Sequence, residues 1–141
     1  SVLSNVDILG AAMLKGPSAR RRMIDLGDAE YTRGKPHPMI DPSVRDDALT
    51  EALAAKDIGV ILVDVVIGYG AHQDPAAHLS ELVKEHGYGG GPLVIASVTG
   101  TEEDPQVRSA KVAKLIAAGI HVAPTNADAA RWALSAIRVA G

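Results

Sequence analysis

The chain has 141 residues, 47% of them hydrophobic, and a formal net charge of −3 at pH 7, which suits one domain with a buried core. The weakly acidic balance excludes the basic surface of nucleic-acid-binding proteins, and no apolar run approaches the roughly 18 residues of a membrane helix. The absence of cysteine excludes disulfides and cysteine-ligated metals and agrees with a cytoplasmic protein, which we expect. From the charge and the short apolar runs we expect neither nucleic acid nor a membrane as partner.

Residues 1–18 are predicted to form an N-terminal arm or a short helix outside the repeating pattern of the chain. The weakly amphipathic stretch 5–15 is followed by Gly-Pro-Ser at 16–18, a combination that interrupts regular structure. The domain proper is therefore expected to occupy residues 19–141.

The first strand and helix of the domain are separated by a long polar loop. The strand is predicted over Arg22 to Leu26, and the loop runs through Asp41. Asp41 is a good N-cap and Pro42 suits the first helical position, so we predict a helix over about 42–56.

The second strand is the most informative segment of the sequence. Residues 59–67 form a continuous aliphatic run, typical of a strand buried on both faces of a parallel sheet. The run ends in glycines, and Asp74 then caps a helix predicted over Pro75 to His86, which Gly87 stops. This pattern predicts a buried strand that leads into a site loop.

Two further strand and helix pairs complete the pattern. A strand is predicted over Leu93 to Val98, followed by a helix from Pro105 that stops at Gly119. The last strand covers Ile120 to Ala123, and Asn126 is predicted as the N-cap of the final helix. The order of strand and helix is thus repeated four times.

This alternation predicts an α/β fold, a flavodoxin-like doubly wound parallel sheet of about four strands with helices on both faces. We expect the strand order 2-1-3-4, which places the first two strands side by side. The loops after these strands would then share one crevice, and residues 34–39 would lie close to residues 68–74.

Two histidines in these loops are the candidate catalytic residues. His72 follows two glycines beyond the end of a strand, and His37 is held in a rigid segment between Pro36 and Pro38. Each also has a structural interpretation. His72 would cap its loop through backbone hydrogen bonds, and His37 would pack against the first helix.

The same loops carry the candidate anion-binding residues. Ligands of open parallel sheets bind beyond the carboxyl ends of the strands, where a helix N-terminus offers free N–H groups. No metal site is expected, because His72, Asp74 and His78 do not supply the three or four converging ligands that a metal needs. The anion-binding candidates are Gly34, Lys35, Gly68, Tyr69, Gly70, Thr99 and Gly100.

Three segments carry a resemblance to a known family: 25–28 (Asp-Leu-Gly-Asp), 31–42 (with Gly-Lys-Pro-His-Pro-Met-Ile-Asp) and 64–75 (with Gly-Tyr-Gly-Ala-His-Gln-Asp-Pro). They resemble the C-terminal part of FdrA proteins, over roughly residues 23–138. FdrA proteins are relatives of succinyl-CoA synthetase, and the more general likeness is to the flavodoxin-like CoA-ligase domain found in both subunits of that enzyme.

The resemblance implies a place for some of these residues. Gly68, Gly70 and the helix beginning at Pro75 would correspond to the glycine-rich turn and the helix whose N-terminus faces a phosphohistidine. The loop that would carry this histidine in the alpha-type subunit corresponds to 98–105, which contains no histidine. FdrA also implies carbamoyl transfer with partner polypeptides, in allantoin and oxamate metabolism.

Two functions follow from the sequence. The first is a component of an acyl- or carbamoyl-transfer enzyme, in which this domain supplies an anion-binding loop and other FdrA-type domains or subunits, or further copies of the chain, complete the site. No nucleotide-binding motif is present, so we expect no intrinsic cofactor and no activity of the chain alone. CoA or a phosphate-bearing ligand would be held through partner domains. The alternative is a noncatalytic assembly or small-anion-binding module.

Overall fold

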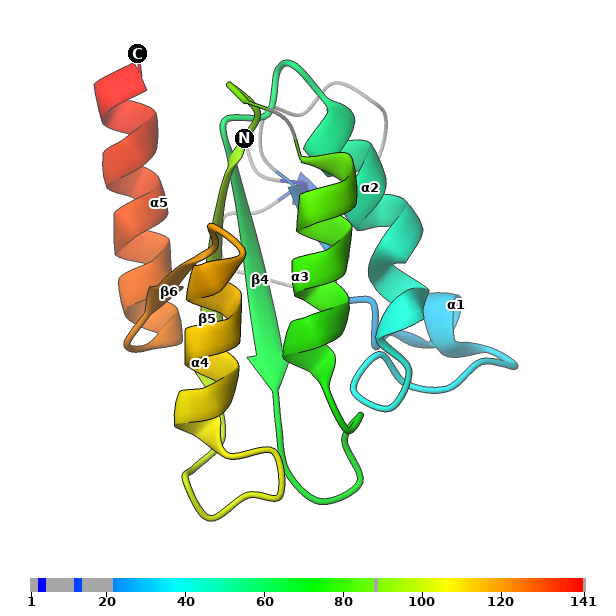
Figure 1. Ribbon diagram of the computed structural model, residues 1–141. Helices are drawn as coiled ribbons and strands as arrows, with labels where there is room; N and C mark the ends of the chain where they lie inside the picture. The colour runs from blue at the N-terminus through cyan, green and yellow to red at the C-terminus, as the bar shows by residue number, and fades with distance from the viewer. Residues whose placement is uncertain (1–2, 5–11, 14–21, 88, 141) are drawn as a thin grey trace.

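The core of the molecule is a parallel sheet with helices on both faces, which confirms the predicted fold class (Figure 1). The computed structural model describes residues 3–4, 12–13, 22–87 and 89–140. The sheet consists of β4 (Val60–Val66), β5 (Leu93–Thr99) and β6 (His121–Ala123) in that order. All its strands are parallel, so their carboxyl ends meet at one edge.

The helices cover the two faces of this sheet unequally. On one face, α2 (Asp46–Ala54), α3 (Pro75–His86) and α4 (Arg108–Ala117) pack around a core to which they contribute Leu53, Leu79 and Leu115. On the other face, α5 (Asn126–Ala140) packs through small alanines against Ile95. No helix in the described part of the chain is long and apolar enough to cross a membrane.

The first predicted strand does not belong to the core sheet. It is shortened to β3 (Arg22–Met23), which pairs with β1 (Leu3–Ser4) in a second parallel sheet that also contains β2 (Ala12–Met13). Within the described residues the core sheet therefore has three strands instead of about four, and β4 pairs directly with β5. Both β3 residues, Arg22 and Met23, are exposed, and neither is part of the core around β4.

Most of the predicted N-terminal arm lies outside the described residues. Its two described pieces, β1 and β2, are strands and not helix. The boundary between an arm at 1–18 and a domain at 19–141 stays a prediction.

Local signals set most helix ends, with several differences from the sequence analysis. The helix predicted from Pro105 begins at Arg108, and a short helix, α1 (Ala29–Thr32), lies in the segment predicted as a loop. Asp41 caps as predicted, but the turn that follows it is a 3-10 helix, η1 (Pro42–Arg45), before α2 begins. At α5 the capping oxygen belongs to Thr125 Oγ1, which accepts from the Asp128 N–H at 3.1 Å, so the predicted cap Asn126 is one residue too late. Asn126 instead donates to Asp64 at 2.7 Å.

Two polar side chains fix the outer strand β4. The carboxylate of Asp64, in the middle of the strand, accepts from Ser97 Oγ and Asn126 Nδ2. Arg45 lies against the other edge of the strand and donates from its guanidinium to the Asp64 carbonyl at 3.1 Å. Burial lowers the pKa of Arg45, and its Nε has no hydrogen-bond partner among the described residues.

Candidate functional site

Strands β4 and β5 end side by side in glycines with unusual backbone angles. Gly68 has φ +138° and Gly100 has φ +148°, backbone angles that are energetically costly for any residue with a side chain. The Ile67 N–H donates to the Thr99 carbonyl at 3.0 Å, so the strands stay paired up to these glycines. A Cβ at Gly100 would lie 2.1 Å from Ile67 Cγ1, so only glycine fits there.

A buried glutamine then holds the loop after β4. The Gln106 side chain accepts from the Gly68 N–H at 3.1 Å and donates to the Gly68 and His72 carbonyls at 3.0 and 3.2 Å. The sequence analysis missed Gln106, because its partners lie 34 and 38 residues away and only its place in a loop after a strand hinted at a site.

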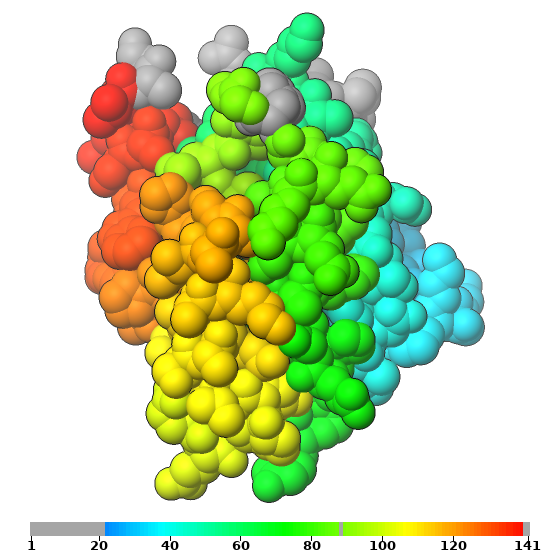
Figure 2. Space-filling model, in the orientation of Figure 1, coloured from blue at the N-terminus to red at the C-terminus, as the bar shows by residue number. Residues whose placement is uncertain are grey.

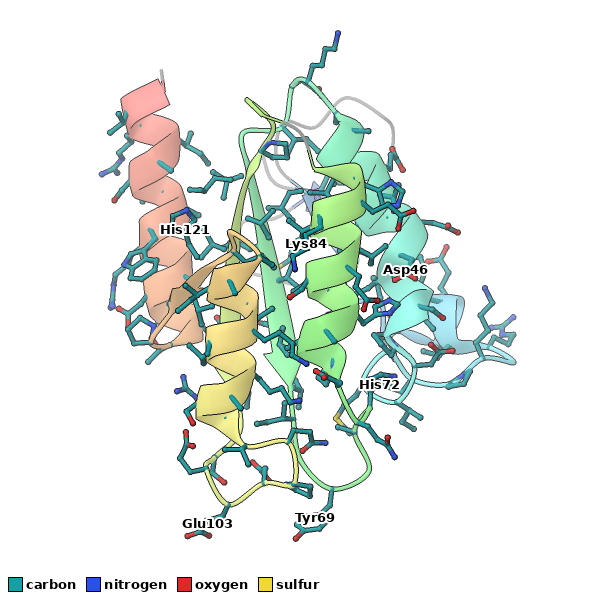
Figure 3. The ribbon with its side chains drawn as sticks, in the orientation of Figure 1. Asp46, Tyr69, His72, Lys84, Glu103 and His121 are labelled. Atoms are coloured by element: carbon teal, nitrogen blue, oxygen red, sulfur yellow. The ribbon has the colours of Figure 1, made fainter. Side chains whose placement is uncertain are left out.

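The loops after the first and second predicted strands meet, as predicted. The His72 N–H donates to the Met39 carbonyl at 2.9 Å, and the Met39 N–H donates to His37 Nδ1 at 3.1 Å. Both candidate histidines are therefore connected through one residue, although the strands that precede their loops do not pair. Figure 3 shows His72 beside the loop that carries this residue.

The ring of His72 is half-buried between the site loop and α3. Its Nδ1 accepts from the Asp74 N–H at 3.0 Å, and its ring centre lies 6.5 Å from that of His78. His78 is paired in turn with Asp46, because its Nε2 lies 2.7 Å from Asp46 Oδ1. This pair connects α3 to α2 and was not predicted.

The ring of His37 has different surroundings. It is exposed and lies against Gly27, where a Cβ would be only 2.6 Å from His37 Nε2. The structural alternative predicted for His37 was packing against the first predicted helix, 42–56. In the structure the ring packs against Gly27, in the segment before that helix. The two histidines are thus connected through the backbone, but their rings have different neighbours. The His37 ring lies at Gly27, and the His72 ring lies near His78.

The start of α3 already holds a carboxylate. Asp74 Oδ1 accepts from the Ala77 N–H at 3.0 Å, and the carboxylate pairs with Lys111 and Lys114 of α4. Burial alone would raise the pKa of Asp74, but hydrogen bonds from Lys114, the Ala77 N–H and Lys111 lower it to about 2. Asp74 is thus the cap that the sequence analysis predicted, and it occupies a donor at this helix start.

The start of α4 is similarly occupied. Glu102 accepts from the Ser109 N–H at 2.9 Å and from the Ser109 hydroxyl at 2.8 Å. Carboxylates from the chain itself therefore occupy N–H groups at the starts of both α3 and α4.

The structure brings five of the seven anion-binding candidates to the edge formed by the ends of β4 and β5. Tyr69 is 85% exposed at the tip of its loop (Figure 3). The other two candidates, Gly34 and Lys35, lie in the turn after α1 (Ala29–Thr32), which Figure 2 shows as a separate projection. The five residues at the edge are Gly68, Tyr69, Gly70, Thr99 and Gly100.

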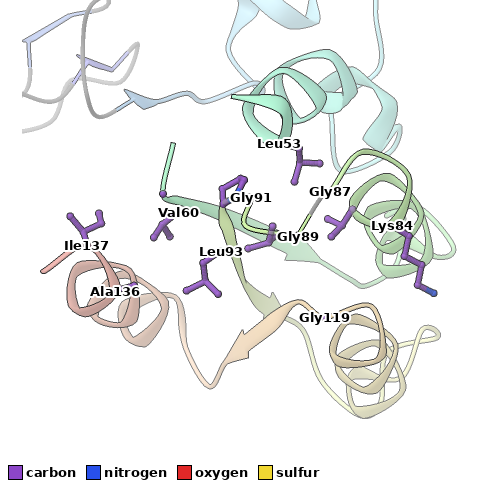
Figure 4. Close-up of a pocket in the computed structure, with 14 residues that line it drawn as sticks. Leu53, Val60, Lys84, Gly87, Gly89, Gly91, Leu93, Gly119, Ala136 and Ile137 are labelled. Carbon is purple, nitrogen blue, oxygen red and sulfur yellow. The ribbon is translucent and has the colours of Figure 1, made fainter. Parts of the chain in front are cut away.

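A cavity lies at the opposite end of the sheet, around the amino ends of β4 and β5 (Figure 4). It has a volume of about 630 Å³, and glycines and aliphatic side chains form most of its lining, including Leu53, Val60 and Ile137. Lys84 is the one charged residue of that lining. Its lining contains none of the predicted site residues.

No group of three or more potential metal ligands converges in the described part of the chain. The carboxyl edge offers hydrogen bonds from loop amides and imidazoles. The N–H groups of Tyr69 and Gly70 have no acceptor among the described residues and are open to a ligand.

Comparison with known proteins identifies the family of this chain. The family model described as CoA-ligase matches residues 7–136. The uncharacterized protein YahF of Escherichia coli (strain K12) is 34% identical over 116 residues, which are 79% of this chain and 22% of that protein. The chain thus spans about a fifth of the length of that curated relative. The chain belongs to the CoA-ligase family, in which it forms a succinyl-CoA synthetase-like domain.

Proposed function

We propose that this domain supplies an anion-binding edge to an acyl- or carbamoyl-transfer enzyme of the FdrA type, which other domains or subunits complete. Membership of the CoA-ligase family and the segments that resemble FdrA support this proposal. The observation that carries it is the 2.9 Å hydrogen bond from the His72 N–H to the Met39 carbonyl. It unites the two segments that are most specific for the resemblance in one surface.

The ligand of this edge is a small carboxylate, carbamoyl or phosphate compound. The open N–H groups of Tyr69 and Gly70 and the imidazole of His72 are donors suited to oxygen atoms. CoA and nucleotide binding are assigned to partner domains, because this chain has no sequence motif for cradling their phosphates.

A binding assay with and without a candidate partner protein tests the proposal. Isothermal titration of the chain with carbamoyl phosphate, oxamate, CoA and ATP should show weak binding of the small anions and no turnover. Addition of the partner should give CoA binding and transfer activity. His72→Ala should weaken anion binding, whereas the matched variant His86→Ala, at the far end of α3, should not. Synthesis of a CoA thioester by the chain alone would contradict the proposal.

One observation favours the alternative, a noncatalytic module. Asp74 and Glu102 occupy the starts of α3 and α4, so the positive ends of these two helices are already compensated. If the complete enzyme retains its full activity with His72→Ala and His37→Ala, the domain serves in assembly and not in chemistry.

A further inference from the structure

Both candidate histidines are held by the same local hydrogen bond. His37 Nδ1 accepts from the Met39 N–H at 3.1 Å, and His72 Nδ1 accepts from the Asp74 N–H at 3.0 Å. A ring nitrogen that accepts a hydrogen bond carries its lone pair, so a neutral ring must carry its proton on the other nitrogen, Nε2.

The surroundings of His72 make this orientation difficult to change. Its N–H is bound to the Met39 carbonyl and its carbonyl accepts from buried Gln106, so the backbone is fixed on both sides of the ring. Asp74, whose N–H the ring accepts, is fixed in turn as the cap of α3. A proton on Nδ1 would leave the Asp74 N–H facing another donor, which costs free energy in a half-buried site.

The other ring nitrogen of His72 is open. Its Nε2 has no hydrogen-bond partner among the described residues, whereas Nε2 of the neighbouring His78 is engaged by Asp46. His72 therefore presents a single N–H donor from the same loop that carries Tyr69 and Gly70.

We propose that His72 acts as a neutral hydrogen-bond donor, through Nε2–H, to an oxygen atom of the bound carboxylate, carbamoyl or phosphate group. This inference rests on the function proposed above and specifies the role of one residue in it. A nucleophile or a general base needs a lone pair at the nitrogen that faces the substrate, and the hydrogen bond at Nδ1 places a proton there instead.

The first test is the tautomer itself, which is independent of any ligand. Long-range nitrogen–proton correlation spectra of the 15N-labelled protein, recorded at neutral pH, should show the proton of the His72 ring on Nε2. A ring protonated on Nδ1, or on both nitrogens, would overturn the proposal.

Three variants separate the donor from the loop contact. His72→Asn retains an oxygen that can accept from the Asp74 N–H but has no distal donor, so it should keep the thermal stability and lose about tenfold in affinity for oxamate or carbamoyl phosphate. His72→Gln retains a distal N–H and should bind within about threefold of the parent, and His72→Ala should bind at least as weakly as His72→Asn. Unchanged affinity of His72→Asn would overturn the donor role.

Mass spectrometry of the complete enzyme after incubation with carbamoyl phosphate provides a last check. We expect no phosphoryl or carbamoyl group on His72, and its detection there would replace the donor by a nucleophile. If the complete parent enzyme binds none of the probes, the proposed function and the donor role fail together. A ring protonated on Nδ1 in an enzyme that does bind them contradicts the donor role alone.

Discussion

The loops that follow β4 and β5 occupy equivalent places in the sheet but are stabilised in different ways. The loop after β5 is held by its own side chains, because Asp104 Oδ2 accepts from the Thr101 N–H at 2.6 Å. The loop after β4 has an internal hydrogen bond to the His72 ring, but it is also held from outside, by Gln106 and by the Met39 carbonyl. A locally folded loop thus acts as the template for the loop that carries the candidate site, which depends on residues remote in sequence.

The largest effect is expected where the two loops begin. Gly100→Ala would force a Cβ against Ile67 and hold a side chain at φ +148°, so we expect a loss of about 3 kcal/mol in the free energy of unfolding. Gly70→Ala, at φ +82° with no atom within 4 Å of the new Cβ, should cost only about 1 kcal/mol. Denaturant unfolding of both variants measures the difference, and equal losses would show that the close contact with Ile67 does not matter.

The second prediction concerns the glutamine that connects the loops. Gln106→Ala removes three hydrogen bonds to the backbone of Gly68 and His72 and should cost about 2 kcal/mol. Hydrogen exchange should accelerate at 68–74 and remain slow in the loop after β5. Faster exchange in both loops would mean that they fold as one unit, which would contradict the comparison.

The third prediction separates charge from capping at Asp74. Its pKa is lowered to about 2 in the folded chain, so its charge contributes stability above the unfolded value near pH 4, and this is lost as the pH falls towards 2. Asp74→Asn keeps a cap but no charge. About a third of the side chain is exposed, so screening limits the expected loss at pH 7 to about 1 kcal/mol.

This difference between parent and Asp74→Asn should be constant from pH 7 to about 5 and should shrink below pH 4. Thermal unfolding of the two proteins across that range measures it. A difference that persists undiminished at pH 2 would show that the ion pairs with Lys111 and Lys114 contribute little.

The smallest effect is expected in the loop after β5, which its own side chains stabilise. Thr101→Val removes a hydroxyl that bonds to Asp104 and accepts from the Glu103 N–H, but these groups are accessible to water. We expect a loss of about 0.5 kcal/mol and no change in ligand binding. A larger effect on binding than on stability would give this loop a direct part in the site.

Local signals predicted most of the fold. The aliphatic run of β4, the caps Asp41 and Asp74 and the alternation of strands with helices are encoded within a few residues of where they act. Strand pairing is not encoded in this way. The sequence offered no local reason for β3 to pair with β1 instead of β4, and the predicted order of strands was wrong for this reason.

The same distinction applies to the candidate site. The meeting of the loops at Met39 and His72 followed from the predicted topology, although the predicted adjacency of their strands was wrong. The roles of Gln106 and of the His78–Asp46 pair could not be predicted, because their partners lie 32 to 38 residues away and amide or imidazole side chains have no local pattern. The catalytic and anion-binding assignments themselves stay predictions.

The guanidinium of Arg45 has a consequence for solubility. The sequence of β4, Val-Ile-Leu-Val-Asp-Val-Val, is of the type that adds strands from other molecules, and within the described residues β4 is an edge of the core sheet. Arg45 occupies the Asp64 carbonyl halfway along that edge. An incoming strand would have to displace this half-buried charged side chain before it could pair along the full length of β4, so one arginine protects an aggregation-prone strand.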